Sequence, residues 1–211
     1  NAGVVEPAKG IIVHSQFSLT LAEQWYGKQV AQSWTYIPHL RCLPQAFVQS
    51  EAKQSLDLKE SDFLVCAFGM LGPTKLNHQL LQAWLDSDLA RNPNCYLVFV
   101  GQNDGGDYGA QLLSDIAQSA CAERVRITGF AEPELFKNYL HACDLAIQLR
   151  TMSRGETSGT VLDCMAHGIA TIINANGTMA ELPADALLKL PDTFAQAQLV
   201  QAIQHLYQDA Q

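Results

Sequence analysis

The sequence predicts a doubly wound α/β fold, in which helices cover both faces of a parallel, Rossmann-like sheet. From residue 62 onward, short apolar runs alternate with segments whose apolar residues recur at helical spacing. This alternation is typical of strand–helix–strand units, whose strands lie parallel. In addition, polar loops that contain glycine follow several of the apolar runs. Because ligands of such sheets bind beyond the carboxyl ends of the strands, we expect the functional site in these loops.

The expected elements follow one another in regular order along the chain. Strands are expected at residues 63–68, 95–100, 125–130, 144–149 and 171–173. Helices are expected around residues 76–85, 112–116, 134–142, 161–166 and 194–207. Ahead of these, residues 10–14 are expected to form a buried strand, 15–26 a helix ending at Gly27, and 33–37 a second strand stopped by Pro38. Residues 43–60 are polar without a strong period, which predicts a linker or a loosely packed crossing segment.

Composition narrows the class of protein. The 211 residues are 48% hydrophobic and 16% charged, which is typical of a globular chain and not of a disordered one. The net charge of −8 argues against a nucleic-acid partner, which would need a basic face. No apolar run is long enough to span a bilayer and no signal peptide stands out, so a cytoplasmic location is expected. The six cysteines occur singly, which predicts buried free thiols and no metal site.

The strongest functional signal lies in residues 150–168, RTMSRGETSGTVLDCMAHG. A buried strand precedes it, and Thr157 and Ser158 are good N-cap residues for the helix that follows. The start of a helix presents unpaired N–H groups and a partial positive charge, which suits a phosphate. The alternative interpretation is an ordinary strand-to-helix turn in which Glu156 is a solvated acid of the first turn.

Two motifs resemble those of the retaining GT-B glycosyltransferases. Residues 156–168, followed by IATII, resemble the family signature E-G-F-G-x-x-x-x-E-A-M-A-x-G-x-P-V-V, with Asp163 at the second glutamate. Six residues separate Glu156 from Asp163, whereas seven separate the two glutamates of the family. Residues 69–75, GMLGPTK, resemble the family's G-R-L-x-x-x-K, with Met70 in place of the arginine. Gly177 and Glu181 also resemble the family's G-G-x-x-E turn.

The resemblance implies roles for particular residues. Lys75 takes the position of the lysine that holds the donor's diphosphate, and Arg150 or Arg154 is expected to replace the missing arginine because a guanidinium fork suits phosphate oxygens. The full set expected at the diphosphate is Gly69, Lys75, Arg150, Arg154, Ser158, Gly159 and Thr160. The residues expected at the nucleoside are Gly129 and Phe130, facing the base, and Asp163, on the ribose. Glu156 resembles the acid near the donor sugar and is the candidate catalytic residue. The alternative for Arg150 is a structural ion pair with a nearby acid.

The implied protein is the C-terminal, donor-binding domain of a GT-B enzyme. Residues 58–211 are assigned to that domain, and residues 1–57 to a tag remnant (Asn1–Ala2), the end of the N-terminal half and the linker. The expected activity is that of a metal-independent retaining hexosyltransferase, mannosyltransferase-like, in bacterial surface polysaccharide biosynthesis. Its substrate would be a GDP- or UDP-linked sugar, with no cofactor. The missing N-terminal half would supply the acceptor site and any peripheral membrane association, so the chain alone is expected to be inactive.

Other functions remain open or are disfavoured. A sugar-nucleotide epimerase shares the GT-B architecture, and a degenerate interaction module is compatible with Met70 and the shortened acid spacing. A dinucleotide-dependent dehydrogenase would need G-x-G-x-x-G directly after a strand, and the glycines between 101 and 109 have the wrong spacing. A P-loop is disfavoured because the residue directly before Lys75 is not a glycine.

Overall fold

A six-stranded parallel sheet forms the centre of the structure, a computed structural model that describes residues 2–210, except the side chains of Ala2 and Val4. Asn1, assigned to a tag remnant, lies outside the described residues. The strands are β3 (Phe63–Phe68), β4 (Cys95–Val100), β5 (Val125–Ile127), β6 (Leu145–Gln148), β7 (Ala170–Asn174) and β8 (Leu188–Leu190). Their order is β5-β4-β3-β6-β7-β8, which confirms the doubly wound α/β fold.

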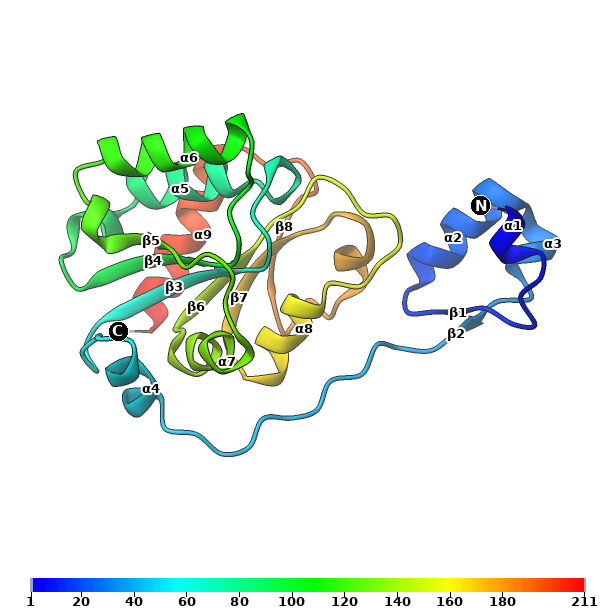
Figure 1. The fold of residues 1–211 in the computed structure, drawn as a ribbon, viewed down its shortest axis with the longest axis horizontal. Helices are drawn as coiled ribbons and strands as arrows, with labels where there is room; N and C mark the ends of the chain where they lie inside the picture. Colours follow the sequence, from blue (N-terminus) through cyan, green and yellow to red (C-terminus); the bar gives the residue numbers. More distant parts are fainter. Residues whose placement is uncertain (1, 211) are drawn as a thin grey trace.

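Helices cover both faces of this sheet (Figure 1). One face carries α5 (Asn77–Asp86), α6 (Asp107–Gln118) and α9 (Gln196–Asp209). The other carries α4 (Gln49–Ser55), α7 (Pro133–Ala142) and α8 (Gly159–Ala166). Successive residues of β3 alternate between the two cores: Val65 packs on the first face and Leu64 and Cys66 on the second. Burial on both faces explains why this strand is an uninterrupted apolar run.

The N-terminal part forms a smaller unit. It contains α1 (Ala2–Val5), β1 (Ile12–Val13), α2 (Gln16–Tyr26), α3 (Lys28–Ala31) and β2 (Thr35–Tyr36). Helix α2 begins after the N-cap Ser15 and ends at Gly27, as expected. The expectation of a buried strand at residues 10–14 is wrong, because Ile12 is 59% exposed. Within the described chain β1 pairs with β2 alone, so this two-stranded sheet lacks the cover that would bury it.

The segment at residues 43–60 is not a linker throughout, because its second half contains α4. Ala52 and Leu56 pack into the core beside α7, and Lys53 pairs with Asp144 at 2.9 Å. The sequence signal was weak because this helix presents only one narrow apolar stripe. The assigned domain boundary after residue 57 stays a prediction.

Three further observations concern expectations from the sequence. Strand β8 was not anticipated, since it has only three residues and two of them are half-buried. Five cysteines are buried and free, whereas Cys42 is exposed, so the expectation of a buried thiol is wrong there. In the described part of the chain, no helix has both the length and the apolar character needed to cross a bilayer.

Candidate functional site

The order of the strands reverses between β3 and β6, and the loops that follow these two strands meet there. The ends of both strands, together with Met70 and Lys75 of the loop after β3, line a small crevice. In doubly wound sheets, ligands bind at such a switch point, beyond the carboxyl ends of the strands. The two loops are tied together because the Thr151 N–H donates to the Thr74 carbonyl at 2.9 Å. The crevice therefore has fixed walls, and it lies where the sequence predicted a site.

The loop after β3 depends on a close approach between two backbones. Gly69 has φ = 101°, a left-handed conformation that favours glycine. A Cβ on Gly101, at the end of β4, would lie 2.1 Å from the Gly69 carbonyl oxygen, so no larger residue fits there without movement. The Leu71 N–H donates to the Gln102 carbonyl at 2.9 Å. These contacts fix the path of the chain that leads to Lys75.

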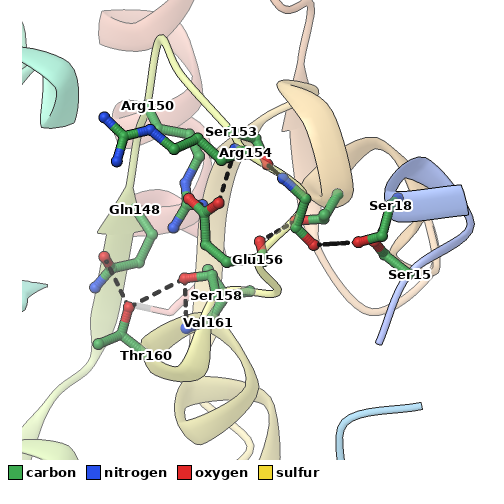
Figure 2. Close-up of polar contacts among 12 residues, drawn as sticks. Ser15, Ser18, Gln148, Arg150, Ser153, Arg154, Glu156, Ser158, Thr160 and Val161 are labelled. Atoms are coloured by element: carbon green, nitrogen blue, oxygen red, sulfur yellow. Dashed lines mark hydrogen bonds and ion pairs between the residues drawn. The ribbon is translucent and has the colours of Figure 1, made fainter. Parts of the chain in front are cut away.

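Arg150 is held rigidly at the end of β6. Its backbone N–H and C=O both bond the side-chain amide of Asn174, at 2.9 and 2.7 Å, and Asn174 is fully buried on the neighbouring strand β7. Only 6% of Arg150 is exposed. Its guanidinium lies 3.4 Å from the Glu156 carboxylate, so it pairs with a nearby acid (Figure 2), and its charge also acts on Lys75.

Lys75 brings a second cation to the same place. Burial, and then the positive charge of Arg150, lower the pKa of Lys75 to about 8, while Glu156 acts in the opposite direction. Burial likewise lowers the pKa of Arg150. Within the described residues, no acceptor lies within hydrogen-bonding distance of the Lys75 ammonium. Two poorly solvated cations that share one carboxylate, Glu156, form a site that an anion would stabilise.

The first turn of α8 forms the floor of this region. Ser158 is the N-cap, as expected, and its Oγ accepts from the Val161 N–H at 3.5 Å. The Thr160 hydroxyl lies 3.3 Å from the Ser158 hydroxyl and 3.4 Å from the side-chain amide of Gln148 (Figure 2). On its other side, the Thr160 methyl lies 3.7 Å from where a Cβ of Gly69 would stand. The N-terminus of α8 is thus packed directly against the ends of β3 and β6.

The remaining charged residues of the loop are less enclosed. Glu156 accepts a hydrogen bond from the Arg154 backbone N–H at 2.7 Å, and its side chain is 56% exposed. Arg154 is exposed, and it is one of the residues that line a different cavity, of about 620 Å³, together with Trp25 and Tyr26 of α2. The structure therefore joins Lys75, Arg150 and Glu156, whereas the exposed Arg154 side chain extends away from α2, on the side of Arg150 (Figure 2).

Helix α2 contacts the same loop through its N-terminus. The Ser15 and Ser18 hydroxyls both donate to the Gly155 carbonyl, at 3.1 and 2.6 Å (Figure 2). The Glu181 carboxylate accepts from the Gln16 N–H at 2.9 Å and from the next N–H in α2. Glu181 thus caps α2 from a distant part of the chain, and α2 supports the loop that carries Glu156.

The residues expected at the nucleoside are spread over two places. Asp163 lies on α8 and pairs with Arg41 at 2.6 Å. Gly129 and Phe130 follow β5, at the edge of the sheet, where the Phe130 ring is 72% exposed. The Phe130 N–H donates to the Gln102 side chain at 3.1 Å, which connects this loop to the loops after β4 and β3.

Arg41 is the residue that sequence reasoning missed. It lies in the extended segment between β2 and α4, and its partner Asp163 is 122 residues further along the chain. A signal was present, because Arg41 is the only Lys, Arg, Asp or Glu between residues 29 and 50. A lone charge in such a segment indicates a specific partner, although the sequence does not identify it.

Comparison with known proteins identifies the class of the fold. The chain matches the family described as "Glycosyl transferases group 1" over residues 48–211. Solved structures with a similar fold include Anabaena Alr3699/HepE in complex with UDP (23% identity, TM-score 0.80, covering 97% of this chain and 55% of that one). WaaG, a glycosyltransferase involved in lipopolysaccharide biosynthesis, is 17% identical with a TM-score of 0.79, covering 94% of this chain and 54% of that one.

A third similar structure is the C-terminal domain of the group 1 family protein LpcC from Francisella tularensis (17% identity, TM-score 0.69, 80% of this chain and 86% of that one). The chain spans just over half the length of HepE and of WaaG. No curated protein matches it. The six-stranded α/β fold matches that of GT-B glycosyltransferase C-terminal domains. The chain belongs to the family of group 1 glycosyl transferases.

Proposed function

We propose that the chain is the donor-binding half of a retaining, metal-independent glycosyltransferase whose donor is a nucleoside diphosphate sugar. The observation that carries this proposal is the placement of Lys75 and Arg150 together at the switch point, both poorly solvated and with a single acid between them. A leaving diphosphate develops negative charge during sugar transfer, and fixed cations in a water-poor site stabilise that charge.

The charges at the site support a diphosphate as ligand. Two cations and the start of α8, which contributes about half a positive charge, face one carboxylate. In this arrangement Lys75 and Arg150 would bind the phosphates, the first N–H groups of α8 would complete the contact, and Asp163 would bind the ribose. Glu156, which is half-exposed between Arg150 and the Arg154 backbone, would face the sugar.

The similar structures guide which donor to test first and which wider role we propose. HepE was solved with UDP and with UDP-glucose, which supports UDP ahead of GDP as the first nucleotide to test. WaaG is described as acting in lipopolysaccharide biosynthesis, which supports a role in surface polysaccharide assembly. Transfer of a hexose, such as mannose, is the step that we propose from the sequence. The acceptor site, and any membrane association, would belong to a further N-terminal half, so the chain alone would transfer no sugar.

Calorimetric titration with UDP, GDP and uridine tests the proposal. Lys75→Ala should weaken UDP binding by about 10- to 100-fold, as for a charge-assisted hydrogen bond of roughly 1.5–3 kcal/mol, and leave uridine binding unchanged. Lys137→Ala is the matched control, because Lys137 is exposed on α7. If the wild-type chain bound neither nucleotide, the proposal would fail. The alternative would then be a degenerate interaction module, with which the exposed Met70 is compatible.

A further inference from the structure

The ion pair between Arg41 and Asp163 places a third cation on the first turn of α8. The Arg41 Nε donates to Asp163 Oδ1 at 2.6 Å. A Cβ on Gly159, the first residue of α8, would lie only 2.4 Å from Arg41 Nη2, so the guanidinium packs directly against the helix backbone at this point. A larger residue at position 159 would displace the Arg41 guanidinium from this position.

The Arg41 guanidinium is held in place but only partly used. Its Nη1 lies 2.9 Å from His39 Nδ1 and 3.2 Å from the Leu40 carbonyl. Nη2, the nitrogen beside Gly159, has no acceptor within hydrogen-bonding distance in the described chain. A cation at the positive end of a helix is unfavourable, and here the Asp163 carboxylate offsets that cost.

The same ion pair is easy to exchange. Both side chains are 28% exposed, and partly exposed pairs of this kind contribute little net free energy. A phosphate would accept two hydrogen bonds from the guanidinium fork, which is a stronger contact than the single bond to Oδ1. It would also neutralise the partial positive charge at the N-terminus of α8. Asp163 does this less well, because it lies one turn further along the helix.

Arg41 and the loop after β3 flank the same turn of α8. Thr160 faces Gly69 on one side, and Gly159 faces Arg41 on the other. Lys75 lines the same pocket as Gln148, which contacts Thr160, so an anion at this turn would lie between the pocket that holds Lys75 and the Arg41 guanidinium.

We propose that Arg41 is a further diphosphate-binding residue, whose ion pair with Asp163 exchanges for a phosphate when a nucleoside diphosphate binds. This inference rests on the proposed function. The exchange would release Asp163 for the ribose and supply the positive charge that is lacking at Met70. It would also connect the segment between β2 and α4 to the occupied donor site.

Arg41→Gln tests this inference, with UDP and uridine as the two probes. UDP affinity should fall about tenfold, while uridine affinity should stay the same or rise, because Asp163 loses a competitor. Arg41→Lys, which keeps the charge and loses the fork, should fall between the wild type and Arg41→Gln. Arg91→Gln is the matched control, since Arg91 forms an ion pair with Asp88 of similar length, 2.7 Å, on an exposed 3-10 helix after α5.

The possible outcomes separate this inference from the proposed function. An equal loss for UDP and uridine would show that Arg41 only positions Asp163, and unchanged UDP affinity would show that it contacts no phosphate; either result overturns the inference. If Lys75→Ala weakened UDP binding while Arg41→Gln did not, the donor site would stand and only the role of Arg41 would fall. Melting temperatures of all variants check folding, and Arg41→Lys decides the question if Arg41→Gln unfolds.

Discussion

The low pKa of Lys75 predicts that UDP binding weakens as the pH rises above 8. The diphosphate should bind the ammonium form of Lys75, and burial beside Arg150 has already lowered the pKa of that ammonium from 10.5 to about 8. A bound phosphate raises the pKa again, because an opposite charge nearby favours the charged form. Above pH 8, binding must therefore be coupled to the uptake of a proton.

The expected size of the effect follows from the same pKa. At pH 7 about nine in ten unliganded molecules carry the proton on Lys75, and at pH 9 only about one in ten does. The apparent UDP affinity should therefore fall about tenfold from pH 7 to pH 9, or roughly 1.4 kcal/mol. With an ordinary lysine pKa of 10.5, affinity would stay almost constant over this range.

Calorimetric titrations with UDP at pH 7, 8 and 9, in two buffers of different ionisation enthalpy, measure both the affinity and the uptake of protons. Lys75→Arg is the matched control, because arginine stays charged throughout this range and should give a constant affinity. If the wild type showed no loss by pH 9, or if Lys75→Arg lost affinity equally, the assignment of the ammonium to the phosphate would be refuted.

Three further predictions concern stability and geometry. Lys75→Met should raise the free energy of unfolding at pH 7, measured with urea, by on the order of 3 kcal/mol, because the lowered pKa of Lys75 penalises its charged form in the folded state. This gain should disappear as the pH rises from 8 to 10.5, where Lys75 loses its proton in the unfolded state too. Gly101→Ala, whose Cβ would meet the Gly69 carbonyl, should weaken UDP binding in titration, whereas Gly105→Ala, with nothing within 4 Å, should not. Asn174→Ala should lower the free energy of unfolding by about 2–4 kcal/mol, since it leaves buried backbone groups without partners. An unfolding free energy equal to that of the wild type would contradict this.

The sequence predicted the fold well for elements that are buried on both faces. Strands β3 and β4 match their expected limits, because each is an apolar run bounded by polar residues. Prediction failed for α4 and β8, which are short and bury only one side, so that their composition resembles that of a loop. The strand order, which creates the crevice between β3 and β6, depends on the direction of each crossover and has no local signal.

The candidate site shows the same division between local and distant contacts. Lys75, Arg150 and Ser158 were identified because each lies at the end of a strand or the start of a helix, and such positions are visible in the chain. Arg41 and the cap that Glu181 forms on α2 were not, because these contacts join residues more than 100 positions apart.

Two lysines with little solvent exposure, the buried Lys53 and the half-buried Lys75, differ in how the fold compensates their charge. Lys53 pairs with the Asp144 carboxylate at 2.9 Å and donates to the Asp62 carbonyl at 2.7 Å, so its charge is compensated within the fold and ties α4 to the sheet. Lys75 has no such partner in the described chain, and its nearest charged neighbours include another cation, Arg150. Buried charges are normally paired, and uncompensated ones persist mainly where function requires them. Since the same fold compensates one lysine completely, the lack of compensation at Lys75 argues that an anionic ligand supplies it.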